Sequence, residues 1–248
     1  MRPDGLHQAF FPVDSPSHQP LPGRLYVVST PIGNLGDLSA RARTLLDQVD
    51  LVACEDTRVT GKLMRHIGAN TPLVAYHEHN EKTKAIELGE ELSAGKSIAL
   101  VSDAGTPGIS DPGFRIVREC RRRGLPVEAV PGPCALTALL SVSGLPTNGF
   151  LFVGFLPPKG AARRTFLERH RDFAYTLALY ESCHRIGKCL DDIVSTLGSE
   201  RVVALGKELT KIHETVFVGS AQRVAEQLAS AAKKGEFTVL IAPSSFEL

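Results

Sequence analysis

The sequence predicts an α/β protein of two domains. Short apolar runs rich in Val, Leu and Ala alternate along the chain with segments of helical periodicity. The runs are continuously apolar, which is typical of strands buried on both faces of a mostly parallel sheet. A cluster of Pro, Asn and Gly in LPTNGF, at 145–150, divides the pattern in two. We therefore expect an N-terminal α/β domain at 24–146 and a C-terminal α/β domain at 147–248, facing a cleft.

In the first half, the expected strands and helices alternate. The apolar runs predict strands at 25–29, 51–55, 72–76, 98–102 and 126–130. The periodic segments predict helices at 39–48, 57–67, 84–95, 113–124 and 134–144. Three glycines near helix ends, Gly68, Gly95 and Gly124, are expected to be left-handed caps.

The second half repeats the alternation with one exception. Strands are expected at 150–155, 175–181, 201–209, 214–219 and 237–242, and helices at 163–170, 183–198 and 221–234. The strands at 201–209 and 214–219 follow each other without a helix between them. Some antiparallel pairing is therefore expected in this half.

Bulk composition favours a cytoplasmic protein. The net charge of +1, from 28 basic and 27 acidic residues, does not mark a nucleic-acid binder. Five cysteines at no framework spacing indicate reduced thiols. No apolar run approaches the length of a membrane span, and no secretory signal is recognisable. Residues 1–23, rich in Pro, His and Ser without periodicity, are expected to be a disordered leader.

The common nucleotide and metal motifs are absent. The GKS at 95–97 lacks the glycine that a P-loop needs at position 90 and precedes its strand, and no G-x-G-x-x-G follows the first strand. His77 and His79 are two residues apart, and the Cys183–Cys189 segment lacks zinc-site spacing, so no metal is expected. A Cys–His or Ser–His nucleophile pair stays open, although no G-x-S-x-G elbow is present.

Chemistry-bearing loops follow the predicted strands. In the first half they read STPIGNLGD, CEDTR, SDAGTPGISDPG and PGPCAL, and in the second half YESCHR and GKELTK. Ligands of open α/β sheets bind at the carboxyl ends of strands, which is where these loops lie. Glycine and proline allow fixed backbone groups to approach a ligand closely. Taken singly each loop is a tight turn; together they predict a small-molecule site.

The sequence resembles the ribosomal small subunit methyltransferase I family of the tetrapyrrole (corrin/porphyrin) methylase superfamily. The resemblance rests on the loops above and on the segments TPIGNLGDLSARA, HEHNE, GFLPPKG, KELTKIHET and KGEFTVLI. The resemblance runs from about Leu25 to Ile241. It implies two α/β domains with S-adenosylmethionine in the cleft between them, and a homodimer. It also implies 2′-O-methylation of the ribose of a cytidine, position 1402, in the decoding region of 16S rRNA. The small ribosomal subunit is then the partner.

The resemblance also implies positions for the cofactor. Asp103, Ala104 and Thr106 match the methionine and sulfonium side, where carbonyl or carboxylate oxygens suit positive charge. Cys134 and Ala135 match the adenosine side. The remaining expected contacts are Pro31 in the first loop, and Tyr180 and Leu209 in the second domain.

Catalysis needs a base for the ribose hydroxyl. The candidates are Glu55 and Asp56 in EDTR, followed by Glu181 and Glu208. The alternative for EDTR is a local helix cap or ion pair, with Thr57 starting the next helix. Asp111, before Pro112, is interpreted as a helix cap.

RNA is expected to be bound by cations that the near-zero net charge confines to one face. The candidates for phosphate contacts are Arg58, Lys159, Arg163, Arg164 and Arg185. Lys207 is a further candidate, and His77, His79 and Asn80 are expected at the cleft rim. The alternative for the two arginine clusters, at 115–123 and 163–171, is a solvated helix face.

Two other functions stay open: methylation of a corrin or porphyrin intermediate, and a non-catalytic ribosome-binding assembly factor. The intact loop set disfavours the second. Family members often continue into a helical tail, whereas this sequence stops at APSSFEL. The family's RNA or dimer contacts that such a tail makes are therefore not carried over, and both a truncated piece and a naturally short protein stay open.

Overall fold

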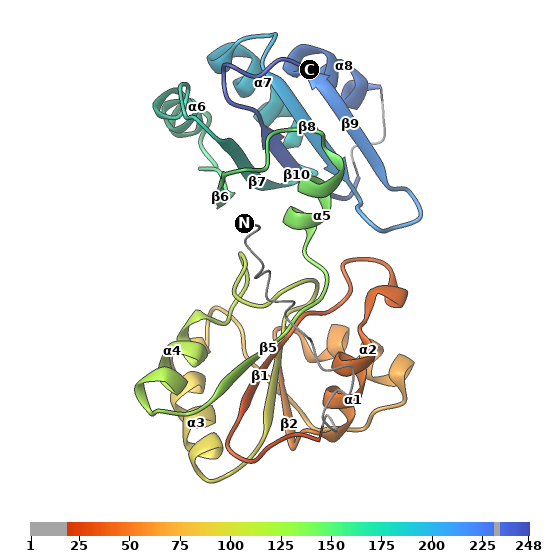
Figure 1. Cartoon of the computed structure of the whole chain (residues 1–248), viewed down its shortest axis with the longest axis vertical. Coiled ribbons are helices and arrows are strands. Elements are labelled where there is room, and N and C mark those ends of the chain that lie inside the picture. Colours follow the sequence, from red (N-terminus) through yellow and green to blue (C-terminus); the bar gives the residue numbers. More distant parts are fainter. Residues whose placement is uncertain (1–18, 231–233) are drawn as a thin grey trace, which may run out of the picture.

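The computed structural model describes residues 19–230 and 234–248. The expected leader lies mostly outside these ranges. The described chain forms two α/β lobes, one above the other in Figure 1, each built on a five-stranded sheet. The predicted α/β class with two domains is confirmed.

The first sheet is entirely parallel, as predicted. Its strands are β1 (Leu25–Val28), β2 (Leu51–Cys54), β3 (Leu73–Ala75), β4 (Ile98–Val101) and β5 (Val127–Val130), in the order β3-β2-β4-β1-β5. One face is covered by α1 (Ala40–Gln48) and α2 (Thr57–Ile67). The other is covered by α3 (Glu81–Ser93) and α4 (Phe114–Arg122). Burial on both faces explains why these strands are continuously apolar.

Local signals define the helix ends in this lobe. The Ser39 hydroxyl accepts a hydrogen bond from the Ala42 amide and begins α1. The Asp56 carboxylate accepts from the Arg58 amide and begins α2, which ends at Gly68 in the left-handed conformation. The capping interpretation of EDTR is therefore correct for Asp56.

The second sheet is mixed. Its strands are β6 (Phe150–Phe155), β7 (Thr176–Ser182), β8 (Val202–Lys207), β9 (Thr215–Ser220) and β10 (Glu236–Ile241), in the order β6-β7-β10-β8-β9. Only β6 and β7 pair in parallel; β8 and β9 form the expected antiparallel pair. One face is covered by α6 (Gly160–Arg169), α7 (Ile186–Leu197) and α8 (Ala221–Ala229).

Helix α5 (Ala135–Val142) covers the opposite face of this second sheet. Leu136, Leu139 and Leu140 of α5 share an apolar cluster with Ala204 of β8 and Leu240 of β10. The chain therefore crosses between the lobes at 131–134, ahead of the boundary expected between 146 and 147. Burial of the apolar face of α5 explains the difference, because that face has its partners on the second sheet. In Figure 1, α5 lies directly above the first lobe.

Along the ranges that the structure describes, no helix combines the length and the apolar character needed to cross a membrane.

Candidate functional site

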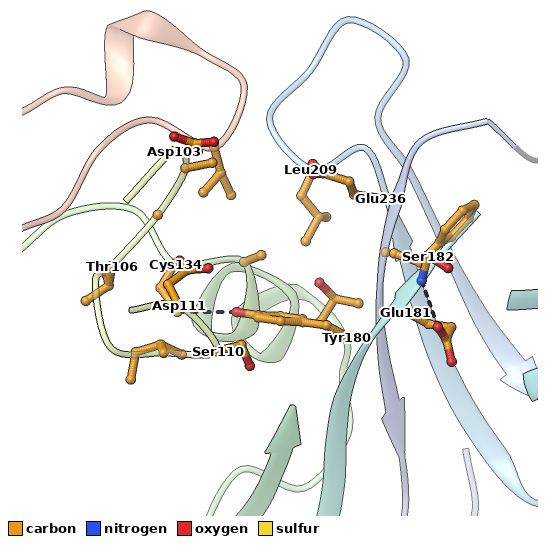
Figure 2. A pocket seen from close by; sticks show the side chains of 18 of the residues that line it. Asp103, Thr106, Ser110, Asp111, Cys134, Tyr180, Glu181, Ser182, Leu209 and Glu236 are labelled. Carbon is orange, nitrogen blue, oxygen red and sulfur yellow. Dashed lines mark hydrogen bonds between the residues drawn. The ribbon is translucent and has the colours of Figure 1, made fainter. Parts of the chain in front are cut away.

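A cavity of about 400 Å³ lies between the lobes, within the size range of small-molecule sites. Its walls come from the loops after β2 and β4, from the start of α5, and from β7, β8 and β10 with the segment after β8. Figure 2 shows side chains of both lobes converging on it. The loops that the sequence singled out thus meet at one place.

The loop after β4, at 102–113, forms one wall. Thr30 and Gly105 exchange backbone hydrogen bonds of 2.9 and 3.0 Å, which tie the loop to the end of β1. Gly105 and Gly108 have φ of 86° and 83°, a conformation that other residues rarely adopt. Ser110 is held at a φ of 65°. The loop is therefore a fixed backbone surface, with several of its groups exposed to a ligand.

Asp103 and Glu55 are neighbours on this wall. The Asp56 amide donates a hydrogen bond of 3.0 Å to Oδ1 of Asp103, which joins the two loops. Burial, followed by repulsion from nearby carboxylates, raises the pKa of both Asp103 and Glu55. Asp56 differs: hydrogen bonds from Arg58 lower its pKa to about 2.

Asp111 lines the cavity and is not a helix cap. Helix α4 begins at Phe114, with Gly113 at the N-cap position and no side-chain cap. Burial, with repulsion from Glu55, raises the pKa of Asp111 to about 6. The interpretation of Asp111 as a cap was wrong, because Gly113 occupies the N-cap position and Asp111 is among the residues that line the cavity.

Hydrogen bonds hold the crossover segment against the loop. The Thr106 hydroxyl donates to the Pro133 carbonyl at 3.0 Å and lies 2.9 Å from the Ser29 hydroxyl. On the other side, the Tyr180 hydroxyl accepts from the Leu136 amide at 3.2 Å. Figure 2 shows the Tyr180 ring extending across the cavity toward Cys134. The residues expected at the adenosine side thus lie where the lobes meet.

The far wall is built around Lys211. Its ammonium group donates to Glu208 and Glu236, at 2.8 Å each. Glu208 adopts a φ of 51°, which is unusual for this residue type. Strained backbone of this kind is frequent at binding sites. The Leu209 side chain points into the cavity in Figure 2.

The cavity is strongly acidic. Six carboxylate residues line it, and the one basic residue among the lining residues in the described part of the chain is Lys211. The six are Glu55, Asp103, Asp111, Glu181, Glu208 and Glu236. Such a set favours a cationic ligand. No cluster of three or more potential metal ligands occurs within 19–230 and 234–248.

Most of the predicted cofactor residues lie together. Asp103, Ala104, Thr106, Cys134, Ala135, Tyr180 and Leu209 all line the cavity. Pro31 is not a lining residue, although its neighbour Ile32 is. Of the candidate bases, Glu55, Glu181 and Glu208 line the cavity, whereas the Asp56 side chain faces Arg58. Glu181 is buried and paired with Arg185 at 3.1 Å.

The predicted RNA contacts divide into surface and interior residues. Arg58, Lys159 and Arg164 are exposed. Arg163 is 3% exposed and donates to Asp192 at 2.7 Å, so its expected phosphate contact is wrong. Arg185 donates to the Leu156 carbonyl at 2.6 Å and pairs with Glu181, so it holds the 156–157 segment instead.

Several lining residues were missed in the sequence: Ile109, Ser110, Phe155, Ser182, Lys211 and Glu236. All six lie inside the quoted segments: Ser182 in YESCHR, Phe155 in GFLPPKG, and the others in SDAGTPGISDPG, GKELTK and KGEFTVLI. Lys211 and Glu236 occur in KELTK and KGEF, and their 25-residue separation gives no sign that they meet.

Known proteins resemble the chain in sequence. Residues 24–225 match the family of Tetrapyrrole (Corrin/Porphyrin) Methylases. Ribosomal RNA small subunit methyltransferase I of Xylella fastidiosa (strain Temecula1) is 50% identical over 222 residues, 89% of this chain and 81% of the relative. The protein of that name from Synechocystis sp. is 46% identical over 225 residues, 91% and 81% of the two chains.

Solved structures agree on the fold. Uroporphyrin III C-methyl transferase from Thermus thermophilus superposes with a TM-score of 0.60 at 21% identity, over 88% of this chain and 96% of the other. Diphthine synthase superposes with a TM-score of 0.68 at 15% identity, over 88% and 90%. From the sequence match and the identities near one half, the chain belongs to the tetrapyrrole (corrin/porphyrin) methylase family, among the ribosomal RNA small subunit methyltransferase I proteins.

Proposed function

We propose that the protein methylates ribosomal RNA of the small subunit with S-adenosylmethionine, at the 2′-oxygen of a cytidine ribose in the decoding region of 16S rRNA. The observation that carries the proposal is the acidic cavity between the lobes, in a chain about half identical to proteins named for this activity. S-adenosylmethionine supplies, when bound, a methyl group on a positively charged sulfur.

The residues present fit this cofactor. Asp103 and Asp111 place carboxylates where a sulfonium or ammonium group needs counter-charge. Ala104 and Gly105 line the cavity beside them, and the backbone bonds between Gly105 and Thr30 hold this wall in place. Tyr180 and Leu209 present apolar surface suited to a planar base.

Glu55 is the best candidate for the base that accepts the proton of the ribose hydroxyl. It lines the cavity, and its raised pKa brings it closer to the working pH, which improves a general base. Asp56 is a poor candidate because its carboxylate is occupied by Arg58 and its pKa is about 2.

The proposal includes the small ribosomal subunit as substrate, a cytoplasmic location and a homodimer. All five cysteines are free, which agrees with a reducing compartment. Strand β6 is an edge strand with Phe150 45% exposed, and Tyr175 beside β7 is 46% exposed. Exposed apolar surface at a sheet edge favours pairing with a second copy.

The test is methyl transfer from labelled S-adenosylmethionine to small subunits that lack the modification. We expect label in 16S rRNA, at the 2′-oxygen of one cytidine. A uroporphyrinoid is offered in a parallel reaction, because the family description also covers tetrapyrrole methylation. Label in the tetrapyrrole alone would overturn the proposal.

Two variants test the roles of the cavity residues. Glu55→Gln should abolish transfer while keeping cofactor affinity. Asp103→Asn should weaken cofactor binding about 10- to 100-fold, the value of one hydrogen bond to a charged group. Cofactor and subunit binding by the wild type without transfer to either substrate would favour a binding factor.

A further inference from the structure

The outer face of α2 carries a row of cations. Arg58, Lys62 and Arg65 lie at positions i, i+4 and i+7, which places them on one side of the helix. All three are exposed, whereas Thr60 and Met64 face the sheet. We call Arg58, Lys62 and Arg65 the α2 row. The helix itself contains no acidic residue to offset them.

The α2 row is only partly neutralised. Among the residues that the structure describes, neither Lys62 nor Arg65 forms an ion pair, and Arg58 pairs only with Asp56. On α4, Arg122 and Arg123 both pair with Glu119, whereas the exposed Arg118 and Arg121 form no ion pair in the described part of the chain.

The α6 cluster is also largely neutralised. Arg163 and Arg164 both pair with Asp192, and Arg171 pairs with Glu168. Paired cations release less free energy on meeting a phosphate, because an existing partner must be displaced. The α2 row therefore matches α4 in unpaired cations, and what distinguishes it is its position beside the cavity.

The row starts at the cavity. Glu55 lines the cavity, and the Asp56 amide at the start of α2 bonds to Asp103. From Arg58 to Arg65 the row extends for about 10 Å along the helix, at 1.5 Å per residue. A nucleic-acid strand presents one phosphate per 3.4 Å of axis, so about three phosphates span this length.

We propose that the α2 row binds the phosphate backbone of the substrate RNA next to the target nucleotide and leads that strand into the cavity. The inference rests on the proposed function. The overall charge is close to zero and the cavity is acidic, so an RNA strand would be repelled there without a local row of cations. Arg58, already paired with Asp56, is the residue of the row nearest in sequence to Glu55, which lines the cavity.

The experiment compares two double variants that change charge equally. Lys62→Glu with Arg65→Glu alters the α2 row. Arg118→Glu with Arg121→Glu alters exposed arginines of α4, on the opposite face of the first sheet. Binding to naked 16S rRNA and to small subunits is measured over a range of salt concentrations, with cofactor affinity and thermal unfolding as controls for folding.

We expect the α2 variant to bind rRNA about tenfold more weakly, with a salt slope smaller by about 1.4, since each lost single-strand phosphate contact removes about 0.7. The KM for small subunits should rise, while cofactor affinity stays that of the wild type. The α4 variant should bind rRNA like the wild type.

Several results would overturn the inference alone. The first is that the α2 variant binds rRNA as tightly as the wild type. The second is that the α4 variant loses as much rRNA affinity as the α2 variant. The third is a loss of affinity for assembled subunits but not for naked rRNA, which would indicate a protein partner for α2. If the wild type neither binds nor methylates rRNA, the proposed function fails together with the inference. Should the α2 variant be unfolded, Lys62→Gln with Arg65→Gln replaces it, with the same expected direction.

Discussion

Asp111 shows how position in the fold assigns a role to a side chain. The sequence SDPG before a helix is typical of a cap, yet Gly113 takes the N-cap position of α4 and Asp111 lines the cavity. There it loses hydration and lies near other acids, so its pKa rises to about 6. The protein thus maintains an unfavourable charge at neutral pH, which is consistent with a site built for a cation.

Asp111→Asn should stabilise the protein at neutral pH. The pKa of Asp111 is 3.8 in the unfolded chain and about 6 in the folded protein. Between these values the folded state holds a proton that the unfolded state has released, so wild-type stability falls as the pH rises through this window. The ceiling is about 3 kcal/mol, and screening by solvent at this partly exposed group reduces it to about 1 kcal/mol.

Urea unfolding measures this effect. We expect the variant to exceed the wild type by about 1 kcal/mol at pH 7.5, with the gap closing toward pH 4. The raised pKa would be contradicted if the variant and the wild type had equal free energies of unfolding at pH 7.5. A difference between the two that grows as the pH falls would contradict it as well.

Arg163 and Arg164 are adjacent in sequence but differ in environment. The Arg163 side chain is 4% exposed and that of Arg164 is 51% exposed, and both contact Asp192. Arg163→Ala leaves a buried carboxylate with a single exposed partner and should cost about 3 kcal/mol of unfolding free energy. Arg164→Ala removes an exposed pair and should cost less than about 1 kcal/mol.

Chemical denaturation of the two variants gives the comparison. Equal losses would show that the buried pair is no more important than the exposed one. A folded Arg163→Ala protein should keep wild-type affinity for rRNA, as expected of a residue that holds α6 against α7 rather than a phosphate.

At the scale of elements, the 102–113 loop depends on backbone conformations that favour glycine. A Cβ at Gly105 would approach Ile32 at 3.3 Å, whereas at Gly108 nothing lies within 4 Å. Both positions have similar positive φ, so alanine costs each about 1 kcal/mol in backbone strain. Gly105 alone bridges to Thr30 and lines the cavity.

The pair Gly105→Ala and Gly108→Ala therefore separates strain from site geometry. We expect similar losses of stability in both, but weaker cofactor binding mainly in Gly105→Ala, measured by calorimetry. Equal cofactor affinities in the two variants would remove the Thr30–Gly105 bridge from the determinants of the site.

The elements themselves were largely predictable. Apolar runs and helical periods predicted the strands and helices to within a few residues, because burial on both faces of a sheet and on one face of a helix leaves a direct pattern. The sheet against which α5 packs was not predictable, because its sequence pattern shows an apolar face without identifying the partner of that face. The structure shows that the partner is the second sheet, through Ala204 and Leu240.

The site was predictable by segment and less so by residue. Motif segments contained most lining residues, since parallel strands bring their loops to one edge. Arg163 was misassigned, although its spacing from Leu167, four residues on, already placed it on the buried face of α6. The contact of Lys211 with Glu236 joins distant segments and leaves no periodic signal.

At the scale of the whole molecule, each lobe has its own core, and the cavity joins them. The apolar clusters on the two faces of the first sheet share no buried residue with those of the second sheet. The lobes are linked through the crossover at 131–134 and through Ile32, which packs against the cluster formed by α5 and the second sheet. Domains joined by so small a contact unfold with limited cooperativity.

A cofactor that contacts both lobes should therefore couple their unfolding. Without cofactor we expect a calorimetric enthalpy larger than the van't Hoff enthalpy, as for two partly independent units. At a concentration of S-adenosylmethionine 100 times Kd, binding stabilises the folded protein by about 2.7 kcal/mol. This stabilisation is lost when either lobe unfolds. The two enthalpies should then converge. Asp103→Asn at the same cofactor concentration is the control and should converge less, because a Kd that is 10- to 100-fold weaker leaves about 0.4 to 1.4 kcal/mol of stabilisation. An unchanged enthalpy ratio in the wild type would mean that the ligand is held by one lobe.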